Sequence, residues 1–427
     1  MEHAQRAAAR AVRRVLGGTT LPVALADVSA EASEERALVQ ELAYGTLRFL
    51  GQSRALVRLL ADRPLADESL EALLWVALYQ LTHTSAPVHA VVNGAVDATG
   101  RLKKSSARGL TNAILRNFLR RRDELLALVA RDDAARYSYQ PWWIERVRAQ
   151  YGARSSAILD AGNARPPLTL RVNRRAIGRD EFVAALAAQG VAGAAIGVSG
   201  VTLATPSAVS ALPGFAQGWF SVQDVGAQLA APLLDVADGM RVLDACAAPG
   251  GKATHLAELA TLDLLALDSD PQRILRIAQN LTRLGLKARV EVADAADVGA
   301  WWDGRAFERI LLDVPCTASG VVRRHPDGKW LRRESDVDAF AAQQRRLLDA
   351  LWPCLAPGGR MLYTTCSIFA TENANQVAAF VARHPDASCV PLQFPAGLEA
   401  DHGQLLPAPS GAEHNHDGFF YALLQKQ

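Results

Sequence analysis

Cysteine is scarce in this chain and never occurs in the spacing of a metal site. Five cysteines are present among 427 residues, all in the C-terminal half: Cys246, Cys316, Cys354, Cys366 and Cys389. An odd number of cysteines without a CxxC pair excludes a disulfide framework and a tetrahedral zinc site. We therefore expect a reducing, cytoplasmic location, no bound metal, and a catalytic role for any special cysteine.

Long apolar runs are also missing. Arg, Asp or Gly interrupts each run before the roughly 18 residues that a membrane span requires. The N-terminal stretch "MEHAQRAAARAVRRVL" lacks the continuous apolar segment of a secretory signal. Its Arg-rich, amphipathic character also fits a transit peptide, but the helical pattern continues beyond it. We favour a helix of the first domain and expect no membrane partner.

The net charge of +2 conceals an asymmetry. Residues 1–150 carry 21 Lys/Arg and 16 Asp/Glu, whereas the remainder carries 25 and 28. A basic N-terminal part on a nearly neutral remainder indicates a polyanionic partner.

Three regions follow one another along the chain. Residues 1–135 repeat apolar residues at helical spacing, as in "ESLEALLWVALYQLTH", and predict an all-α bundle. Residues 140–235 combine short strand patterns with one amphipathic helix, "RDEFVAALAAQG", and predict a small α+β module. Residues 236–427 alternate buried strands with helices. This rhythm predicts an α/β domain with a mostly parallel, doubly wound sheet.

The strands of the third region are predicted from apolar runs at residues 240–245, 263–268, 288–294, 309–314 and 359–365. A last strand, "GFFYALL" at 418–424, is expected to pair antiparallel at an edge of the sheet. In such sheets ligands bind beyond the carboxyl ends of the parallel strands.

The first of these strands ends in a glycine-containing loop, "DACAAPGGK", from Asp244 to Lys252. Asp268, at the end of the second strand, is placed to bind a ribose, and Asp294, at the end of the third, to meet an adenine amino group. The loop is not GxGxxG, and neighbouring acids disfavour a pyrophosphate. S-adenosylmethionine, a cationic cofactor without phosphate, suits this pattern.

Cysteines follow the next two strands. Cys316 lies in "DVPCTASG" and Cys366 in "TTCSIFATEN". Carbon 5 of cytosine attacks a methyl sulfonium only after a thiolate has added to carbon 6, and a carboxyl group at the ring nitrogen assists that addition. Asp313, Cys316 and Cys366 supply an acid, a nucleophile and an eliminating base, but these patterns do not decide between the two cysteines. Ser367, Glu372 and Asn373 are interpreted as shaping the turn and capping the next helix.

Basic and aromatic residues accompany these motifs. The segment "VVRRHPDGKW" contributes Arg323, Arg324, His325, Lys329 and Trp330, and the strand "LTLRVNRR" contributes Arg171 and Arg174. Such groups bind the phosphates and stack on the bases of single-stranded RNA. The alternative is a solvated loop with Trp330 packed beneath it.

"DACAAPGGK", "LLDVPCTASGVVRRHPDGKW" and "TTCSIFATEN" resemble the RNA cytosine-5 methyltransferases of the Nop2/Sun class, also called the Fmu family. The resemblance implies a Rossmann-like domain with a mostly parallel seven-stranded sheet. It also implies that Cys366 is the nucleophile and that Cys316 assists breakdown of the adduct. The cofactor residues it implies are Cys246, Ala247, Ala248, Pro249, Gly250, Gly251, Lys252, Asp268, Asp294 and Asp313.

The N-terminal part, with "RALVQELAYGTLR", is similar to the NusB-like RNA-binding domain. That domain is typical of the subgroup that acts on small-subunit ribosomal RNA at cytosine 967 of 16S rRNA. We therefore expect a monomeric enzyme that methylates this RNA. Two alternatives stay open: a tRNA-directed enzyme of the same class, and a non-catalytic NusB-like RNA-binding or antitermination factor.

Overall fold

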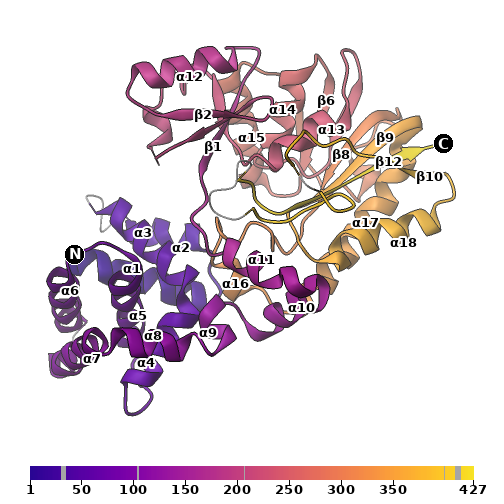
Figure 1. Cartoon of the computed structure of the whole chain (residues 1–427). Helices are drawn as coiled ribbons and strands as arrows, with labels where there is room; N and C mark the ends of the chain where they lie inside the picture. The colour runs from indigo at the N-terminus through magenta and orange to yellow at the C-terminus, as the bar shows by residue number, and fades with distance from the viewer. Residues whose placement is uncertain (30–34, 103–104, 206, 399, 409–414) are drawn as a thin grey trace. The chain divides into compact units, whose positions relative to one another are not determined.

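The structure is a computed structural model that describes residues 1–29, 35–102, 105–205, 207–398, 400–408 and 415–427 (Figure 1). The chain forms two compact units. Unit 1 comprises Met1–Asn163 and Val322–Glu334, and unit 2 comprises Ala164–Val321 and Ser335–Gln427.

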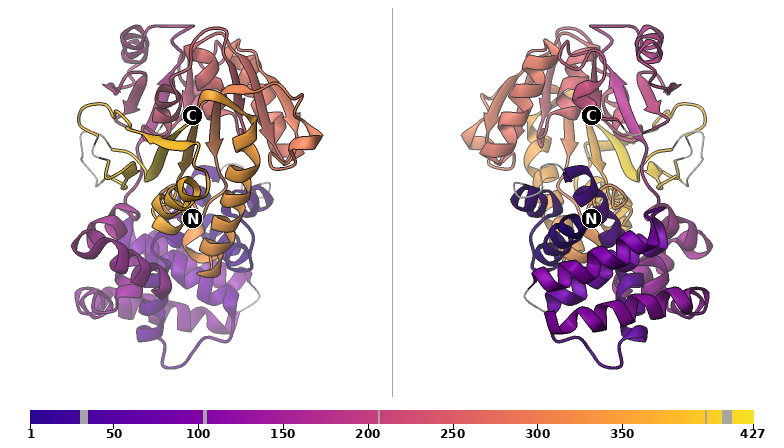
Figure 2. Two further views of the ribbon diagram at one scale, coloured as in Figure 1. Left: turned by 90° about the vertical axis from the view of Figure 1, so that its right-hand side faces the viewer. Right: turned by 90° about the vertical axis from the view of Figure 1, so that its left-hand side faces the viewer.

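Within the described residues of unit 1, all regular secondary structure is helical, which confirms the predicted all-α region (Figure 2). Its core is built mainly from Ala, Val and Leu side chains of the helices α1 to α8, with Phe118 and Trp75 among the largest. The helices are α1 (Glu2–Leu16), α2 (Leu21–Ser29), α3 (Arg36–Arg48), α4 (Leu50–Leu60), α5 (Glu68–His83), α6 (Val88–Arg101), α7 (Arg108–Arg120), α8 (Arg122–Val129), α9 (Asp133–Tyr137), α10 (Pro141–Tyr151), α11 (Ser155–Ala161) and α16 (Gly328–Leu331).

Unit 2 contains two sheets. The smaller is antiparallel, in the order β2-β3-β1-β4, and packs on α12 through Phe182, Leu186 and Phe220. The sheet and α12 form an α+β module, as predicted, but residues 140–163 of the predicted region belong to unit 1. Its elements are β1 (Leu168–Val172), α12 (Arg179–Ala188), β2 (Gly193–Ile196), β3 (Gly200–Leu203) and β4 (Phe220–Val222).

The larger sheet has the order β10-β12-β9-β8-β5-β6-β7, with β11 paired to β12 beside this path. Strands β5 to β9 pair in parallel, as predicted. The strands are β5 (Arg241–Asp244), β6 (Asp263–Asp268), β7 (Arg289–Val292), β8 (Phe307–Asp313), β9 (Leu355–Thr365), β10 (Ala387–Val390), β11 (Gln404–Leu405) and β12 (Phe419–Lys426).

The last strand, β12, is antiparallel to β9, as expected, but it does not lie at the edge of the sheet. β10 pairs with its other side and forms the edge instead. The four-residue sequence "ASCV" of β10 is too short and too polar to be recognised as a strand without its partner.

Helices cover both faces of the larger sheet (Figures 1 and 2). Adjacent residues of β5 point to opposite faces: Val242 joins the core beneath α13 (Ala230–Leu234), α14 (Gly251–Leu259) and α15 (Pro271–Leu284). Leu243 joins the core beneath α17 (Ser335–Leu351) and α18 (Ala374–Arg383). Burial on both faces explains why these strands read as nearly continuous apolar runs.

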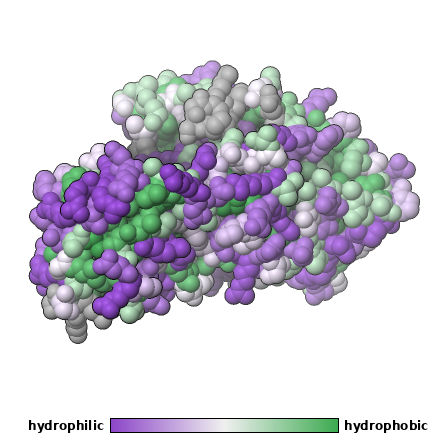
Figure 3. All heavy atoms as spheres, turned by 60° about the horizontal axis from the view of Figure 1, so that its bottom comes forward, coloured by the Kyte–Doolittle hydropathy of each residue, from purple (hydrophilic) through white to green (hydrophobic). Residues whose placement is uncertain are grey.

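Polar side chains cover most of the face drawn in Figure 3, with smaller apolar areas between them. Within the described ranges, each helix is either too short or too polar to pass through a lipid bilayer.

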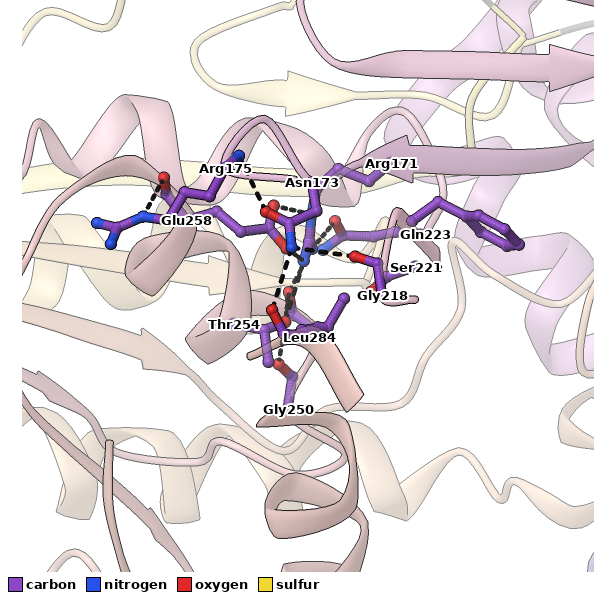
Figure 4. Close-up of polar contacts among 12 residues, drawn as sticks. Arg171, Asn173, Arg175, Gly218, Ser221, Gln223, Gly250, Thr254, Glu258 and Leu284 are labelled. Carbon is purple, nitrogen blue, oxygen red and sulfur yellow. Dashed lines mark hydrogen bonds and ion pairs between the residues drawn. The ribbon is translucent and has the colours of Figure 1, made fainter. Parts of the chain in front are cut away.

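A buried ion pair joins the small sheet to α14 (Figure 4). Arg171 on β1 and Glu258 on α14 have side-chain exposures of 0% and 2% and approach to 2.6 Å. The same guanidinium donates to Thr254 Oγ1, Gln223 Oε1 and the carbonyl oxygen of Gly251. These contacts use every direction in which the guanidinium can donate, so Arg171 has a structural role and is not available to RNA.

We expect Arg171→Met to lower the free energy of unfolding of the protein by about 3–5 kcal/mol, because it leaves Glu258 buried without its partner. Differential scanning calorimetry measures the effect. Arg174→Met, at an exposed position three residues away, is the matched control. Adding Glu258→Leu to the Arg171 variant should recover much of the loss. Unchanged stability of Arg171→Met would show that the pair is not holding β1 to α14.

Candidate active site

The predicted site residues converge where the strand order reverses. From β5, the chain continues to β6 and β7 on one side of the sheet and then returns to β8 and β9 on the other. The loops after β5 and β8 therefore separate and leave room for a ligand between them. A cavity at this position is lined by Ala245, Cys246, Ala248, Asp268, Ser269, Arg273, Ala293, Asp294, Ala295, Asp313, Val314, Pro315, Cys316, Ala318, Gln343, Leu347 and Cys366.

The lining includes both predicted catalytic cysteines, Asp313, and four further cofactor candidates: Cys246, Ala248, Asp268 and Asp294. Ala247, Pro249, Gly250, Gly251 and Lys252 belong to the same loop and the start of α14 but do not line the cavity. Gly250 has φ +99°, a left-handed conformation that lets the loop turn into α14. Sequence reasoning missed Ser269, Arg273 and Gln343, which carry no motif of their own.

The acidic residues at the strand ends, Asp268, Asp294 and Asp313, each lie near a basic side chain. Asp268 lies 3.7 Å from Arg273, and Asp294 lies 2.8 Å from Arg346. Burial disfavours the charge of Asp294, but the hydrogen bonds from Arg346 and from the N–H of Ala296, together with the charge of Arg346, outweigh it and lower the pKa of Asp294. Asp268 also accepts bonds from the backbone N–H groups of Ala248 and Asp270, each at 3.1 Å. The acidic rim predicted from the sequence is thus present, and it is largely neutralised by these partners.

Arg273 is the one basic side chain among the described residues that line the cavity. The cavity therefore offers carboxylates that can bind hydroxyl or ammonium groups of a ligand. It also offers a single cation that can bind a carboxylate of the ligand. This arrangement fits a ligand that carries charges of both signs, such as an amino acid joined to a nucleoside. A pyrophosphate would require a cluster of cations or exposed N–H groups.

Lys252 and Asp313 form a close ion pair, with Nζ 2.5 Å from Oδ2. Burial alone would lower the pKa of Lys252, but the charge of Asp313, the hydrogen bond to it, and the charges of Cys366 and Asp244 together outweigh burial and raise the pKa. The neighbouring Asp244 is fully buried, and its pKa rises to about 8, first through burial and then through the charge of Asp313. Asp313 is thus paired with a cation. The neighbouring Asp244 is mostly protonated near neutral pH.

Asp244 was quoted in the sequence motif but was not predicted as a site residue. Its place at the end of the central strand, two residues before Cys246, was the only available signal.

The sulfur atoms of Cys316 and Cys366 lie 3.4 Å apart. Cys316 is buried, whereas Cys366 is half-buried at the cavity wall. The hydrogen bond to Cys366, burial, and the charges of Cys366 and Glu372 raise the pKa of Cys316 well above that of a free thiol. Either sulfur could be the donor in this contact, and Cys316 is the more deeply buried of the two. This asymmetry between the two cysteines was not visible in the sequence.

The residues predicted to bind RNA divide into exposed and buried ones. Arg174 and His325 are exposed, and Arg324 and Trp330 are half-buried. Trp330 donates its indole N–H to the carbonyl oxygen of Leu47 and packs against the core of unit 1, as in the alternative interpretation.

Arg323 and Lys329 are buried within unit 1. Lys329 Nζ donates to the carbonyl oxygen of Arg48 at 2.7 Å and to Asn163 Oδ1 at 2.6 Å. Burial and the nearby charge of Arg48 lower the pKa of Lys329. Together with Arg171, these two residues have no exposed surface for a phosphate, so we remove all three from the predicted RNA surface.

Comparisons with known proteins give consistent matches over the whole chain. Residues 231–425 match the family model "16S rRNA methyltransferase RsmB/F", residues 139–210 match the ferredoxin-like domain of RsmF/B-like methyltransferases, and residues 2–120 match the NusB family. The chain is 46% identical to "Ribosomal RNA small subunit methyltransferase B" of Pseudomonas putida, over 98% of both chains. The same-named protein of Pseudomonas syringae pv. tomato is 44% identical, over 98% of this chain and 96% of its own.

A solved structure, that of PH0851, has a TM-score of 0.81 and 26% identity, and the match covers 100% of this chain and 99% of that one.

Proposed function

Because this chain belongs to the RsmB/F family of 16S rRNA methyltransferases, we propose that it methylates carbon 5 of a cytosine in 16S rRNA, at cytosine 967, through a covalent adduct with Cys366. The observation that carries the proposal is the pair of sulfur atoms 3.4 Å apart at the wall of the cavity. A cysteine that only packs in the core does not account for a second cysteine in contact with it at the wall of the cavity.

The two cysteines have different roles in this proposal. Cys366 attacks carbon 6 of the pyrimidine, which raises the electron density at carbon 5. After methylation, Cys316 releases its own proton to solvent and, as a thiolate, removes the proton from carbon 5. The electrons of that C–H bond form the double bond between carbons 5 and 6, and Cys366 leaves carbon 6 as a thiolate. The raised pKa of Cys316 supports this division, since a more basic thiolate is the better proton acceptor and the poorer attacking group at neutral pH.

Asp313 assists the attack in this proposal. A carboxylate beside the ring nitrogen stabilises the protonated form of that nitrogen, which draws electrons away from carbon 6. Lys252, at 2.5 Å from Asp313, adds a positive charge near the ring.

S-adenosylmethionine is the proposed methyl donor, and when bound it supplies a methyl group on a cationic sulfur. Asp268, Asp294 and the loop from Cys246 to Lys252 would hold it. The carboxylates of Asp268 and Asp294 suit hydroxyl and amino groups, and Arg273 suits a carboxylate.

RNA is the proposed partner, bound by a monomer in the cytoplasm. Arg174, Arg324, His325 and Trp330 remain the proposed contacts, with the target base taken out of its stack because carbons 5 and 6 are inaccessible within a helix. Affinity should fall steeply with salt, since phosphate contacts supply most of it.

The proposal is tested by incubating the protein with labelled S-adenosylmethionine and unmodified small-subunit rRNA, and then mapping the methylated base. We expect one labelled cytosine, at carbon 5. Transfer RNA in the same assay is the control. Labelling of tRNA alone would overturn the substrate, and tight RNA binding without any label would overturn the enzymatic proposal.

A further inference from the structure

A buried carboxylate joins the two loops that carry the cysteines. Glu372 has no exposed surface and ends the 3-10 helix Ala370–Glu372. Its Oε1 accepts a hydrogen bond from the N–H of Thr317 at 2.8 Å. Its Oε2 accepts bonds from Thr317 Oγ1 and Ser367 Oγ, each at 2.6 Å. Thr317 directly follows Cys316, and Ser367 directly follows Cys366, so both loops are held by one charge.

Further bonds complete the network. Gln344 Nε2 donates to Glu372 Oε1 at 3.3 Å and to the carbonyl oxygen of Pro315 at 2.9 Å. Ser319 Oγ lies 2.9 Å from Ser367 Oγ and accepts a bond from the N–H of Ile368 at 2.9 Å. Four donors thus converge on Glu372. This arrangement suits an ionised carboxylate, whose two oxygens act only as acceptors. Burial raises the pKa of Glu372, and the hydrogen bonds from Ser367, Thr317 and Gln344 oppose that rise.

We propose that Glu372 is a positioning residue that holds the two sulfur atoms side by side and, through its negative charge, confines the ionised sulfur of the pair to Cys366. The roles of the two cysteines in this inference rest on the proposed function. The distribution of charge between them is a property of the free protein and can be measured without RNA or cofactor.

The charged groups around the two sulfur atoms have opposite signs. Cys316 faces the Glu372 carboxylate and the Tyr363 side chain, whose hydroxyl donates to the carbonyl oxygen of Glu372 at 2.6 Å. Burial and the charges of Cys316 and Glu372 raise the pKa of Tyr363, so it stays neutral.

Cys366 faces the cavity and interacts electrostatically with the Lys252 ammonium and with Tyr421. Burial, followed by the charge of Asp313, raises the pKa of Tyr421, so Lys252 is the charged one of these two neighbours. Its positive charge favours an anion at Cys366, whereas the negative charge of Glu372 opposes one at Cys316.

The test is the rate at which iodoacetamide alkylates each cysteine of the reduced full-length protein between pH 6 and pH 10, read by peptide mass spectrometry. Glu372→Gln removes the charge and keeps the shape. We expect the pH midpoint of Cys316 to fall and the ratio of Cys366 to Cys316 alkylation to fall about tenfold, as for a pKa change of about one unit. Glu372→Asp, which keeps the charge, should restore most of the wild-type ratio.

Thr317→Val is the matched control, because it removes a donor to Glu372 but keeps the charge. We expect its ratio to stay at the wild-type value. A purely structural role would instead make both cysteines of Glu372→Gln react faster at every pH, with unchanged midpoints and with the same change in Thr317→Val. That result would overturn the inference without bearing on methylation, which is measured separately with the wild-type protein.

Discussion

Cys366→Ala is expected to abolish methylation of small-subunit rRNA, with a loss of at least about 10³-fold in turnover, because no other group supplies the nucleophile for carbon 6. Cys366→Ser should be nearly as inactive, since a serine hydroxyl does not ionise at neutral pH. The measurement is transfer of labelled methyl groups under single-turnover conditions, together with binding of S-adenosylmethionine, which should change little.

Cys389→Ala is the matched control for Cys366→Ala. Cys389 is exposed on β10, outside the residues that line the cavity, and its loss should leave turnover unchanged. A covalent RNA adduct in Cys366→Ala, combined with the absence of one in Cys316→Ala, would reverse the two roles. In that case the raised pKa of Cys316 in the free protein would have to change when RNA binds.

The parallel strands of unit 2 were predictable because burial on both faces makes each of them a run of apolar residues. The predicted run at 263–268 coincides with β6, and the other four differ from β5, β7, β8 and β9 by a few residues at their ends. Topology then brought the motifs together, since parallel strands end at one edge of the sheet. The site was therefore predictable from strand ends plus chemistry. β10 was not, because its stability comes from pairing with β12 and not from its own sequence.

The state of each charged group was not predictable in the same way. From the sequence, Lys329 and Arg323 were predicted to lie in a basic loop. In the structure, Lys329 donates to the carbonyl oxygen of Arg48, 281 residues earlier in the chain. Arg171 read as part of a basic strand, and its partner Glu258 lies 87 residues later. A charged side chain is buried only where a distant segment supplies its partners, and sequence patterns contain only local spacing. For the same reason the raised pKa values of Asp244 and Cys316 became visible only in the structure.

Cys316→Ala is expected to stop the reaction one step later than Cys366→Ala. The attack on carbon 6 requires Cys366 and Asp313, which this change leaves in place. Removal of the proton from carbon 5 requires the lost thiolate, so the bond between Cys366 and carbon 6 should persist. The protein should accumulate as a covalent complex with RNA, visible as a band of reduced mobility on a denaturing gel.

The adduct of Cys316→Ala should depend on both Cys366 and the methyl donor. Without methylation of carbon 5, the bond between Cys366 and carbon 6 simply reverses; after methylation, the adduct persists until the proton on carbon 5 is removed. The double variant Cys316→Ala/Cys366→Ala should give no band, and neither should Cys316→Ala without S-adenosylmethionine. Nuclease digestion should reduce the band to the protein plus a few nucleotides that contain 5-methylcytosine. A band that persists without Cys366 would place the covalent bond on another residue. Full turnover by Cys316→Ala would mean that water or a different group removes the proton, and that the second sulfur, although 3.4 Å from the first, has no part in product release.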